Sequence, residues 1–187
     1  MAAAREILTE EGYSAAVTLR GVARRVGVAA PSIYGHFPDP EAIVQAVVVA
    51  TFDELDQAVA AATEGLTEPV ERLLVGCEAY VTFGIEHVNL YRLLFERNRQ
   101  LGGHRPEGRE VEESDLQTGP FGRLVAGVEA CIESGASTAP SGPMTALQLW
   151  VALHGLIVLR GAQYEMPWPA RPVMERSLVL GIAHIAA

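Results

Sequence analysis

Polar groups able to bind a phosphate or the edge of a base gather in residues 18–37, TLRGVARRVGVAAPSIYGHF. The donors are a guanidinium, two hydroxyls and an imidazole, on Arg20, Ser32, Tyr34 and His36. Between them, Ala29 and Ala30 are small enough to let a backbone approach the bases, and alanine can contact a thymine methyl. This mixture suits sequence-specific contact with double-stranded DNA.

A helix, a tight turn and a second short helix are predicted to position these groups. Thr18 is the expected N-cap of the first helix, Gly27 turns the chain, and Pro31 suits the first turn of the next helix. The apolar spacing predicts a buried face made of Leu19, Val22, Ala23, Val26, Val28 and Ile33. The outward face is then Ala29, Ala30, Ser32, Tyr34 and Gly35. This pair of helices has the form of a helix-turn-helix.

Helical periodicity continues along the rest of the chain. Helices are predicted at 2–11, from Asp39 to about 63, at 68–86, from Asn89, at 120–134, at 144–164 and from about 172 to 186. Residues 99–117 are polar and glycine-containing, which predicts a loop. Because no segment alternates as a strand does, the chain is predicted to be all-α.

The charge balance limits how such a protein could bind DNA. All 14 basic residues are arginines, and the net charge is −9. Residues 1–50 contain four arginines, at 5, 20, 24 and 25, against five acids, at 6, 10, 11, 39 and 41. Broad electrostatic attraction is therefore excluded, and binding is expected to depend on a few short-range contacts doubled by a dimer.

Other classes of protein are disfavoured. The longest apolar run, 147–159, has 13 residues and includes Gln148 and His154, which favours a buried helix over a membrane span. No secretory signal is evident, so the cytoplasm is expected. Cys77 and Cys131 lack metal-ligand spacing; buried free thiols are expected, with a redox or disulfide role as the alternative. No catalytic or cofactor-binding spacing is found, so neither an enzyme nor a cofactor is expected.

Residues 3–50 resemble the N-terminal domain of the tetracycline-repressor (TetR) family of transcriptional regulators. The resemblance rests on T-L-R-G-V-A-R-R-V-G-V, A-A-P-S-I-Y-G-H-F and the following E-A-I-V. It implies contacts from Thr18 and Arg20 to the DNA backbone. It also implies a recognition helix whose DNA-contacting residues are Ala29, Ala30, Pro31, Ser32, Tyr34 and His36. Many members have a phosphate-binding lysine where this chain has Pro40, so one phosphate contact is expected to be missing or replaced by backbone N–H groups.

In the TetR family the C-terminal helices form a ligand pocket and a dimer interface. Trp150, His154 and Gly155 resemble the W-x-x-x-H-G signature of one C-terminal subgroup, and H-x-x-L-Y-R-L-L-F at 87–95 resembles it too. Ligand contacts are expected from a set of aromatic and histidine side chains, namely Tyr80, Phe83, His87, Tyr91, Phe95, Trp150, His154 and Tyr164. The alternative for this stripe is ordinary core packing.

These features together predict a two-part regulator. Residues 1–45 are expected to form the DNA-binding domain, and residues 46–187, joined to it by a long helix, the ligand-binding and dimerisation domain. The expected function is a homodimeric repressor released from a palindromic operator by a small hydrophobic or aromatic effector. Helices 144–164 and 120–134 are expected at the dimer interface. The alternative is a helical small-molecule-binding protein without DNA binding.

Overall fold

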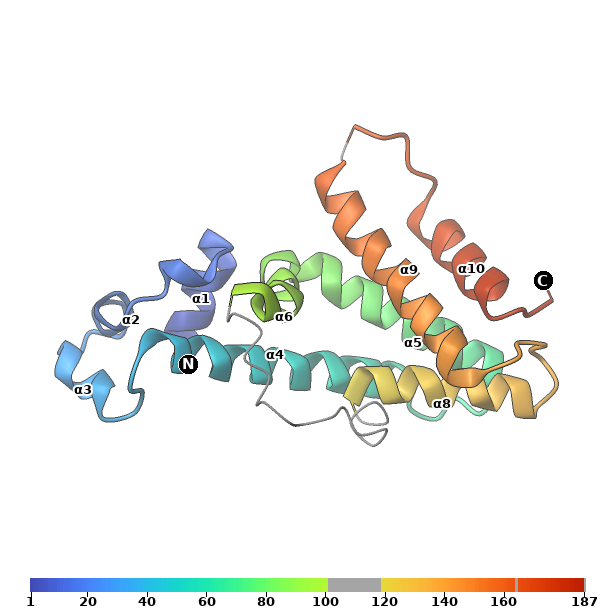
Figure 1. The fold of residues 1–187 in the computed structure, drawn as a ribbon, viewed down its shortest axis with the longest axis horizontal. Coiled ribbons are helices and arrows are strands. Elements are labelled where there is room, and N and C mark those ends of the chain that lie inside the picture. The colour runs from blue at the N-terminus through green and yellow to red at the C-terminus, as the bar shows by residue number, and fades with distance from the viewer. Residues whose placement is uncertain (101–118, 164, 187) are drawn as a thin grey trace. The chain divides into compact units, whose positions relative to one another are not determined.

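The computed structural model describes residues 1–100, 119–163 and 165–186. Within these residues the chain is helical apart from its connections, as predicted, and forms two compact units (Figure 1). The first unit comprises Met1–Glu54 and, with His87, helix α6; the second comprises Leu55–Glu86 and helices α8 to α10. Helix α4 contributes residues to both. The expected division at residue 45 is by function and stays a prediction.

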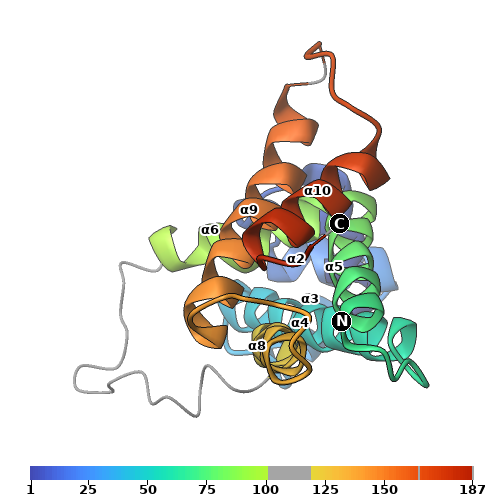
Figure 2. The ribbon, with the colours of Figure 1, turned by 90° about the vertical axis from the view of Figure 1, so that its right-hand side faces the viewer.

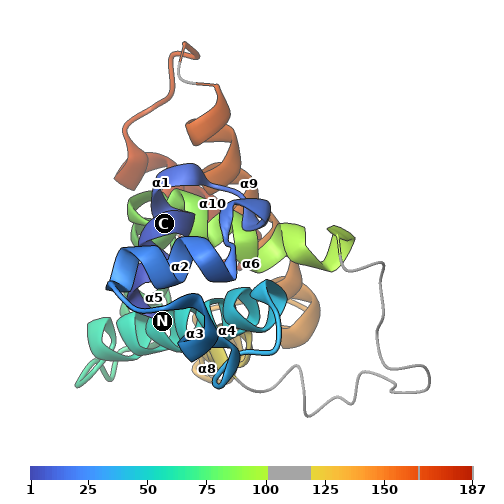
Figure 3. The same cartoon turned by 90° about the vertical axis from the view of Figure 1, so that its left-hand side faces the viewer.

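The first unit is built on three short helices, a 3-10 turn, the first part of α4 and the whole of α6. They are α1 (Ala2–Glu11), the 3-10 turn Ser14–Ala16, α2 (Leu19–Val26), α3 (Ala30–Tyr34), the first part of α4 (Pro40–Ala62), and α6 (Val88–Gln100). Helix α1 contacts α2 and α6, and α2 contacts α3 (Figure 3). Leu8, Val22, Ile43 and Leu90 are buried in this unit, and such apolar burial is the main force that holds it together.

Side-chain caps explain why these helices begin where they do. Thr18 Oγ1 accepts a hydrogen bond from the Gly21 N–H at 3.0 Å, and Asp39 Oδ1 accepts one from the Ala42 N–H at 2.8 Å. Each bond satisfies an N–H that has no partner inside its helix. Gly27 ends α2 in the left-handed conformation, with φ of 72°, which glycine adopts without steric cost. The turn between α2 and α3 is therefore set locally by the sequence.

The second unit is a bundle in which two central helices contact most of the others. Its elements are the end of α4, α5 (Pro69–Glu86), α8 (Gly119–Glu133), α9 (Gly142–Ala162) and α10 (Arg171–Ile182). Both α5 and α9 contact α8, α10 and each other (Figure 2). Val81, Val128, Leu149 and Val179 are buried between them.

The last helix ends earlier than the sequence predicts. Helix α10 stops at Ile182, whereas the periodicity predicts a helix to residue 186. The Ser137 hydroxyl donates to the Ala183 carbonyl at 2.6 Å, and the Thr138 N–H donates to the His184 carbonyl at 3.2 Å. The C-terminal residues leave the helix to pair with 137–138, a contact between residues far apart in the sequence.

Helix α9 is longer than the 13-residue apolar run suggests. Within the described residues it is the one helix long and apolar enough to cross a membrane, with a mean hydropathy of 1.5. The core helix of a soluble protein passes the same test. Leu149, Leu153 and Ile157 are buried on the face toward the bundle, whereas Met144 and Val151 are exposed on another.

Candidate nucleic-acid interface and ligand site

Helices α2 and α3 form the predicted helix-turn-helix, and α3 presents the predicted contact residues to solvent. Tyr34 is 57% exposed. Thr18, Arg20, Ala29, Pro31, Ser32 and His36 are also exposed, and Ala30 is partly exposed. No acidic side chain lies between Val26 and Pro38, so this surface has hydrogen-bonding groups without charge repulsion toward phosphates.

Two valines at the turn do not take the buried positions predicted for them. Val26 is 49% exposed and Val28 is 45% exposed. Helix α3 is only five residues long, and of its side chains Ile33 is the large apolar one, half-buried against the rest of the unit. A helix this short does not cover both valines, so they remain at the surface.

Of the four arginines in residues 1–50, two form ion pairs with residues that the structure describes and two do not. Arg25 of α2 forms ion pairs with Glu10 at 2.7 Å and with Glu6 at 3.7 Å, and these two pairs fasten α2 to α1. The hydrogen bond to Glu10 raises the pKa of Arg25. Arg5 forms an ion pair with Glu54 of α4. Arg20 and Arg24 make no ion pair with any residue the structure describes and are exposed.

The start of helix α4 departs from the family pattern but keeps its backbone donors. Pro40 is the first residue of α4, where its missing N–H has no helical partner in any case. Asp39, just before it, is occupied in capping the Ala42 N–H. The expectation that one phosphate contact is missing here, or replaced by backbone N–H groups, stays a prediction. The acidic side chain of Asp39 lies directly before Pro40 in the chain.

Helix α6 contacts helix α1, which in turn contacts α2 of the helix-turn-helix. The Asn89 side-chain amide donates to the Thr9 carbonyl in the last turn of α1 at 2.8 Å. Gly12, which ends α1 with φ of 75°, lies against the same amide, and a Cβ there would stand 3.1 Å from Asn89 Oδ1. Asn89 thus joins the two helices at one point.

The residues predicted to bind a ligand fall into two groups. In the second unit, Trp150 Nε1 donates to the Tyr80 hydroxyl at 3.1 Å. The Trp150 ring lies 6.0 Å from that of Phe121 and 6.2 Å from that of His154, measured between centroids. We call Tyr80, Phe121, Trp150 and His154 the aromatic cluster. Phe83 is buried in the same unit, and Phe121 was not predicted.

The other group lies in the first unit. The Tyr91 and Phe95 ring centroids are 4.9 Å apart, and Phe52 of α4, which the sequence analysis missed, lies 6.1 Å from Phe95. Tyr91 is fully buried, and His87 is half-buried. Tyr164 lies outside the described residues. The assignment of ligand contacts stays a prediction, as does the likeness to the W-x-x-x-H-G subgroup.

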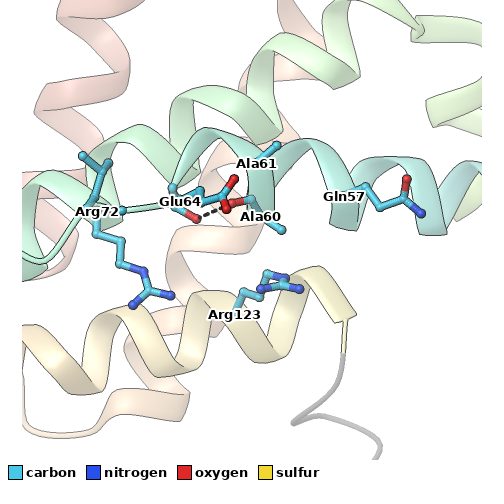
Figure 4. Close-up of a pocket in the computed structure, with 9 residues that line it drawn as sticks. Gln57, Ala60, Ala61, Glu64, Arg72 and Arg123 are labelled. Atoms are coloured by element: carbon cyan, nitrogen blue, oxygen red, sulfur yellow. Dashed lines mark hydrogen bonds between the residues drawn. The ribbon is translucent and has the colours of Figure 1, made fainter.

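A surface groove of about 530 Å³ lies in the second unit, and no residue of the aromatic cluster lines it. It is formed by the end of α4, the connection to α5, and α5 and α8 (Figure 4). Arg123 on its wall makes two hydrogen bonds to Asp56, at 2.6 and 3.0 Å, and Arg72 stands on the α5 side. None of the predicted ligand residues lines this groove.

Burial shifts both cysteines, His154 and Glu175 of the second unit toward their neutral forms. Both cysteines are buried free thiols, as expected, and burial raises the pKa of Cys77 to about 12, which keeps it unreactive. Burial lowers the pKa of His154, so its imidazole is neutral at physiological pH. Glu175 of α10 is 4% exposed, and burial raises the pKa of its carboxyl.

Known proteins match both halves of the chain. Residues 1–47 match the family described as bacterial regulatory proteins, tetR family, and residues 73–184 match the tetracyclin repressor-like C-terminal domain. The HTH-type transcriptional activator FasR of Mycolicibacterium smegmatis is 36% identical over 97 residues. That match covers 51% of this chain and 43% of FasR, so it spans less than half of the curated relative.

Solved structures match the fold over nearly the whole chain. PfmR, a TetR family transcriptional regulator from Thermus thermophilus, superposes with a TM-score of 0.69 at 20% identity, covering 99% of this chain and 97% of PfmR. A bacterial regulatory protein in the tetR family from Rhodococcus RHA1 gives a TM-score of 0.71 at 19% identity, covering 100% and 95%. With family matches to both the helix-turn-helix and the C-terminal helices, the chain belongs to the tetR family of bacterial regulatory proteins.

Proposed function

We propose that the chain is a cytoplasmic transcriptional regulator that binds a two-fold-symmetric DNA operator as a homodimer. A small apolar or aromatic effector binds among the C-terminal helices and releases it. The observation that supports this most strongly is the exposed, uncharged surface of α3, with Ser32, Tyr34 and His36 at the end of a capped helix-turn-helix. A helix whose outward face lacks acids suits close approach to DNA.

An apolar face on α9 supports dimerisation. Met144, Leu147, Val151 and Leu159 recur at helical spacing and are 56%, 40%, 61% and 51% exposed. Such a row exposed on one chain is typical of a surface buried by a second copy. The exposed side chains of α8 include Arg123, Glu129 and Glu133, which disfavour the α8 interface expected from the sequence. On α10, Val173 is 65% exposed, so we place α9 and α10 at the interface.

The aromatic cluster supports an apolar or aromatic effector. Its rings offer apolar surface, and the Tyr80 hydroxyl, the Trp150 indole N–H and the neutral His154 imidazole offer polar contacts. Sites for small molecules commonly combine a mostly apolar wall with a few polar groups. The same contacts also hold α9 to α5 in the bundle.

Two elements of the first unit can transmit a change to the DNA-binding helices. Helix α4 follows the recognition helix and continues into the second unit. Helix α6 is fastened to α1 through the bond from Asn89 to the Thr9 carbonyl. An effector that prefers one arrangement of α4 and α6 shifts the DNA-binding equilibrium, and DNA shifts effector affinity equally. A coupling of about 1–3 kcal/mol changes DNA affinity about 5–150-fold.

Repression is our proposal for the outcome of binding, although the curated relative is named as an activator. A reporter gene downstream of the operator, measured with and without the regulator, decides the sign. The alternative, a helical small-molecule-binding protein without DNA binding, is favoured by the excess of acids over arginines in residues 1–50.

Gel retardation of the DNA upstream of the protein's own gene tests the proposal. Tyr34→Ala should weaken binding at least about tenfold, because a lost hydrogen bond to a charged phosphate costs about 1.5–3 kcal/mol. Tyr13→Ala is the matched control, since Tyr13 is 53% exposed but lies outside the helix-turn-helix. Equal retardation by both variants and the wild type would refute the assigned contact surface. Absence of retardation by the wild type, together with failure to bind any selected duplex, would favour the alternative.

A further inference from the structure

The ion pairs of the first unit determine which of its arginines remain available to a phosphate. Of the four arginines in residues 1–50, two are neutralised: Arg5 by Glu54, and Arg25 by Glu10 with Glu6 nearby. Their guanidinium groups hold α1 to α4 and α2 to α1. To contact DNA they would have to give up these bonds. Arg20 and Arg24 can contact a phosphate without breaking an ion pair, since neither is ion-paired within the described residues.

These two available arginines share one face of α2. They are four residues apart, a spacing that places side chains one above the other on a helix. Both are exposed, on the helix that contacts α3, the recognition helix. In helix-turn-helix proteins the helix before the recognition helix crosses the DNA backbone. A guanidinium on that helix is thus suited to a phosphate rather than to a base.

We propose that Arg24 is a second phosphate contact of this regulator, beside Arg20, and that Arg25, the next residue, is not one. This inference rests on the proposed DNA-binding function. It adds a contact that the resemblance to the family does not supply, and it offsets the lysine missing at Pro40. Arg24 and Arg25 are adjacent arginines that the sequence does not distinguish. The tertiary ion pair with Glu10 neutralises Arg25 and leaves Arg24 available to a phosphate.

The proposal gives a definite salt dependence. Two guanidinium contacts per protomer make four per dimer. The logarithm of the binding constant should then fall with the logarithm of salt concentration with a slope of about −3.6, since each neutralised phosphate contributes about −0.9. Arg24→Gln removes one contact per protomer, so the slope should become shallower by about 1.8. A contribution to sequence preference is not expected, because a phosphate contact affects all sequences alike.

Fluorescence anisotropy of a labelled operator duplex, titrated at several salt concentrations, measures these slopes. The variants are Arg24→Gln and the double variant Arg25→Gln with Glu10→Gln, which removes an ion pair without changing net charge. Arg72→Gln, in the second unit, matches the charge change of Arg24→Gln outside the DNA-binding unit. Circular dichroism confirms that each variant is folded. We expect a shallower slope for Arg24→Gln alone, with both controls within about 0.5 of wild type.

The outcomes separate this inference from the proposed function. A wild type that binds with a steep slope and an Arg24→Gln variant with the same slope would overturn the role of Arg24 and leave DNA binding intact. An equal loss of slope in the Arg25 and Glu10 double variant would overturn the selection by ion pairing. A wild type that binds no duplex would overturn the proposed function and this inference with it.

Discussion

Close packing between α5 and α9 makes Gly84 sensitive to the smallest substitution. An added Cβ would lie 2.6 Å from Ile157 Cδ1, 3.1 Å from Cγ2 and 3.2 Å from Cγ1. All three atoms belong to one side chain that is 1% exposed, so Ile157 must move as a whole in a filled core. The Gly84→Ala variant is therefore expected to be destabilised.

The size of the effect follows from two opposing contributions. Replacing glycine by alanine inside a helix stabilises by about 1 kcal/mol, while overpacking a core costs about 1–3 kcal/mol. With three close contacts we expect a net loss of about 1–2 kcal/mol, or about 2–8 °C in Tm for a chain of this size. Gly76→Ala in the same helix is the matched control. Its Cβ would meet Thr63 Cγ2 at an ordinary 3.4 Å, so that variant should gain up to about 1 kcal/mol.

Urea unfolding followed by circular dichroism, at one fixed protein concentration, measures these differences. Ile157→Val tests the cause, because it removes Cδ1, the closest atom. In that background the cost of Gly84→Ala should shrink by at least about 0.5 kcal/mol. A Gly84→Ala protein as stable as Gly76→Ala would refute the packing argument, and so would an unchanged cost in the Ile157→Val background.

Three further predictions concern other features of the molecule. Burial raises the pKa of Glu175, so the folded state favours the protonated carboxyl and stability is lost as pH rises through that pKa. Glu175→Gln should raise Tm near about pH 7 but not below about pH 4, and calorimetry that shows no pH-dependent difference contradicts this. Val151→Glu places a charge on the exposed face of α9 and should give a monomer by sedimentation. Ala126→Glu on α8 should leave the dimer intact. If the Val151→Glu variant is dimeric as well, α9 is not the dimer interface. Asn89→Ala loses the 2.8 Å bond to the Thr9 carbonyl, so hydrogen exchange should speed up in α1 and not in α5. Unchanged exchange in α1 would show that this bond does not hold the helix.

Local signals in the sequence predict most of the fold. Thr18, Gly27 and Asp39 act as the cap, turn and cap that their residue types predict, because these interactions involve neighbours within about four residues. The end of α10 is not predictable in this way. It depends on Ser137, which lies far away in the sequence and binds the Ala183 carbonyl.

The contact surface is predicted better than its charge. Exposure of Ser32, Tyr34 and His36 follows from the spacing of their apolar neighbours. The spacing wrongly assigns Val26 and Val28 to the core, because a pattern does not show that α3 is too short to cover them. Which arginines are neutralised depends on how α1 lies against α2 and α4, and the sequence alone does not show this.

Selection of binding sites from a pool of random DNA duplexes tests the central claim most directly. The purified protein is mixed with the pool, and retained duplexes are amplified and sequenced over several rounds. A homodimer with one recognition helix per protomer predicts enrichment of an inverted repeat whose half-sites face the same side of the duplex, about 10 base pairs or a multiple apart. Enrichment should be lost in Tyr34→Ala and kept in Tyr13→Ala. A wild-type protein that enriches no sequence above the starting pool would contradict the account.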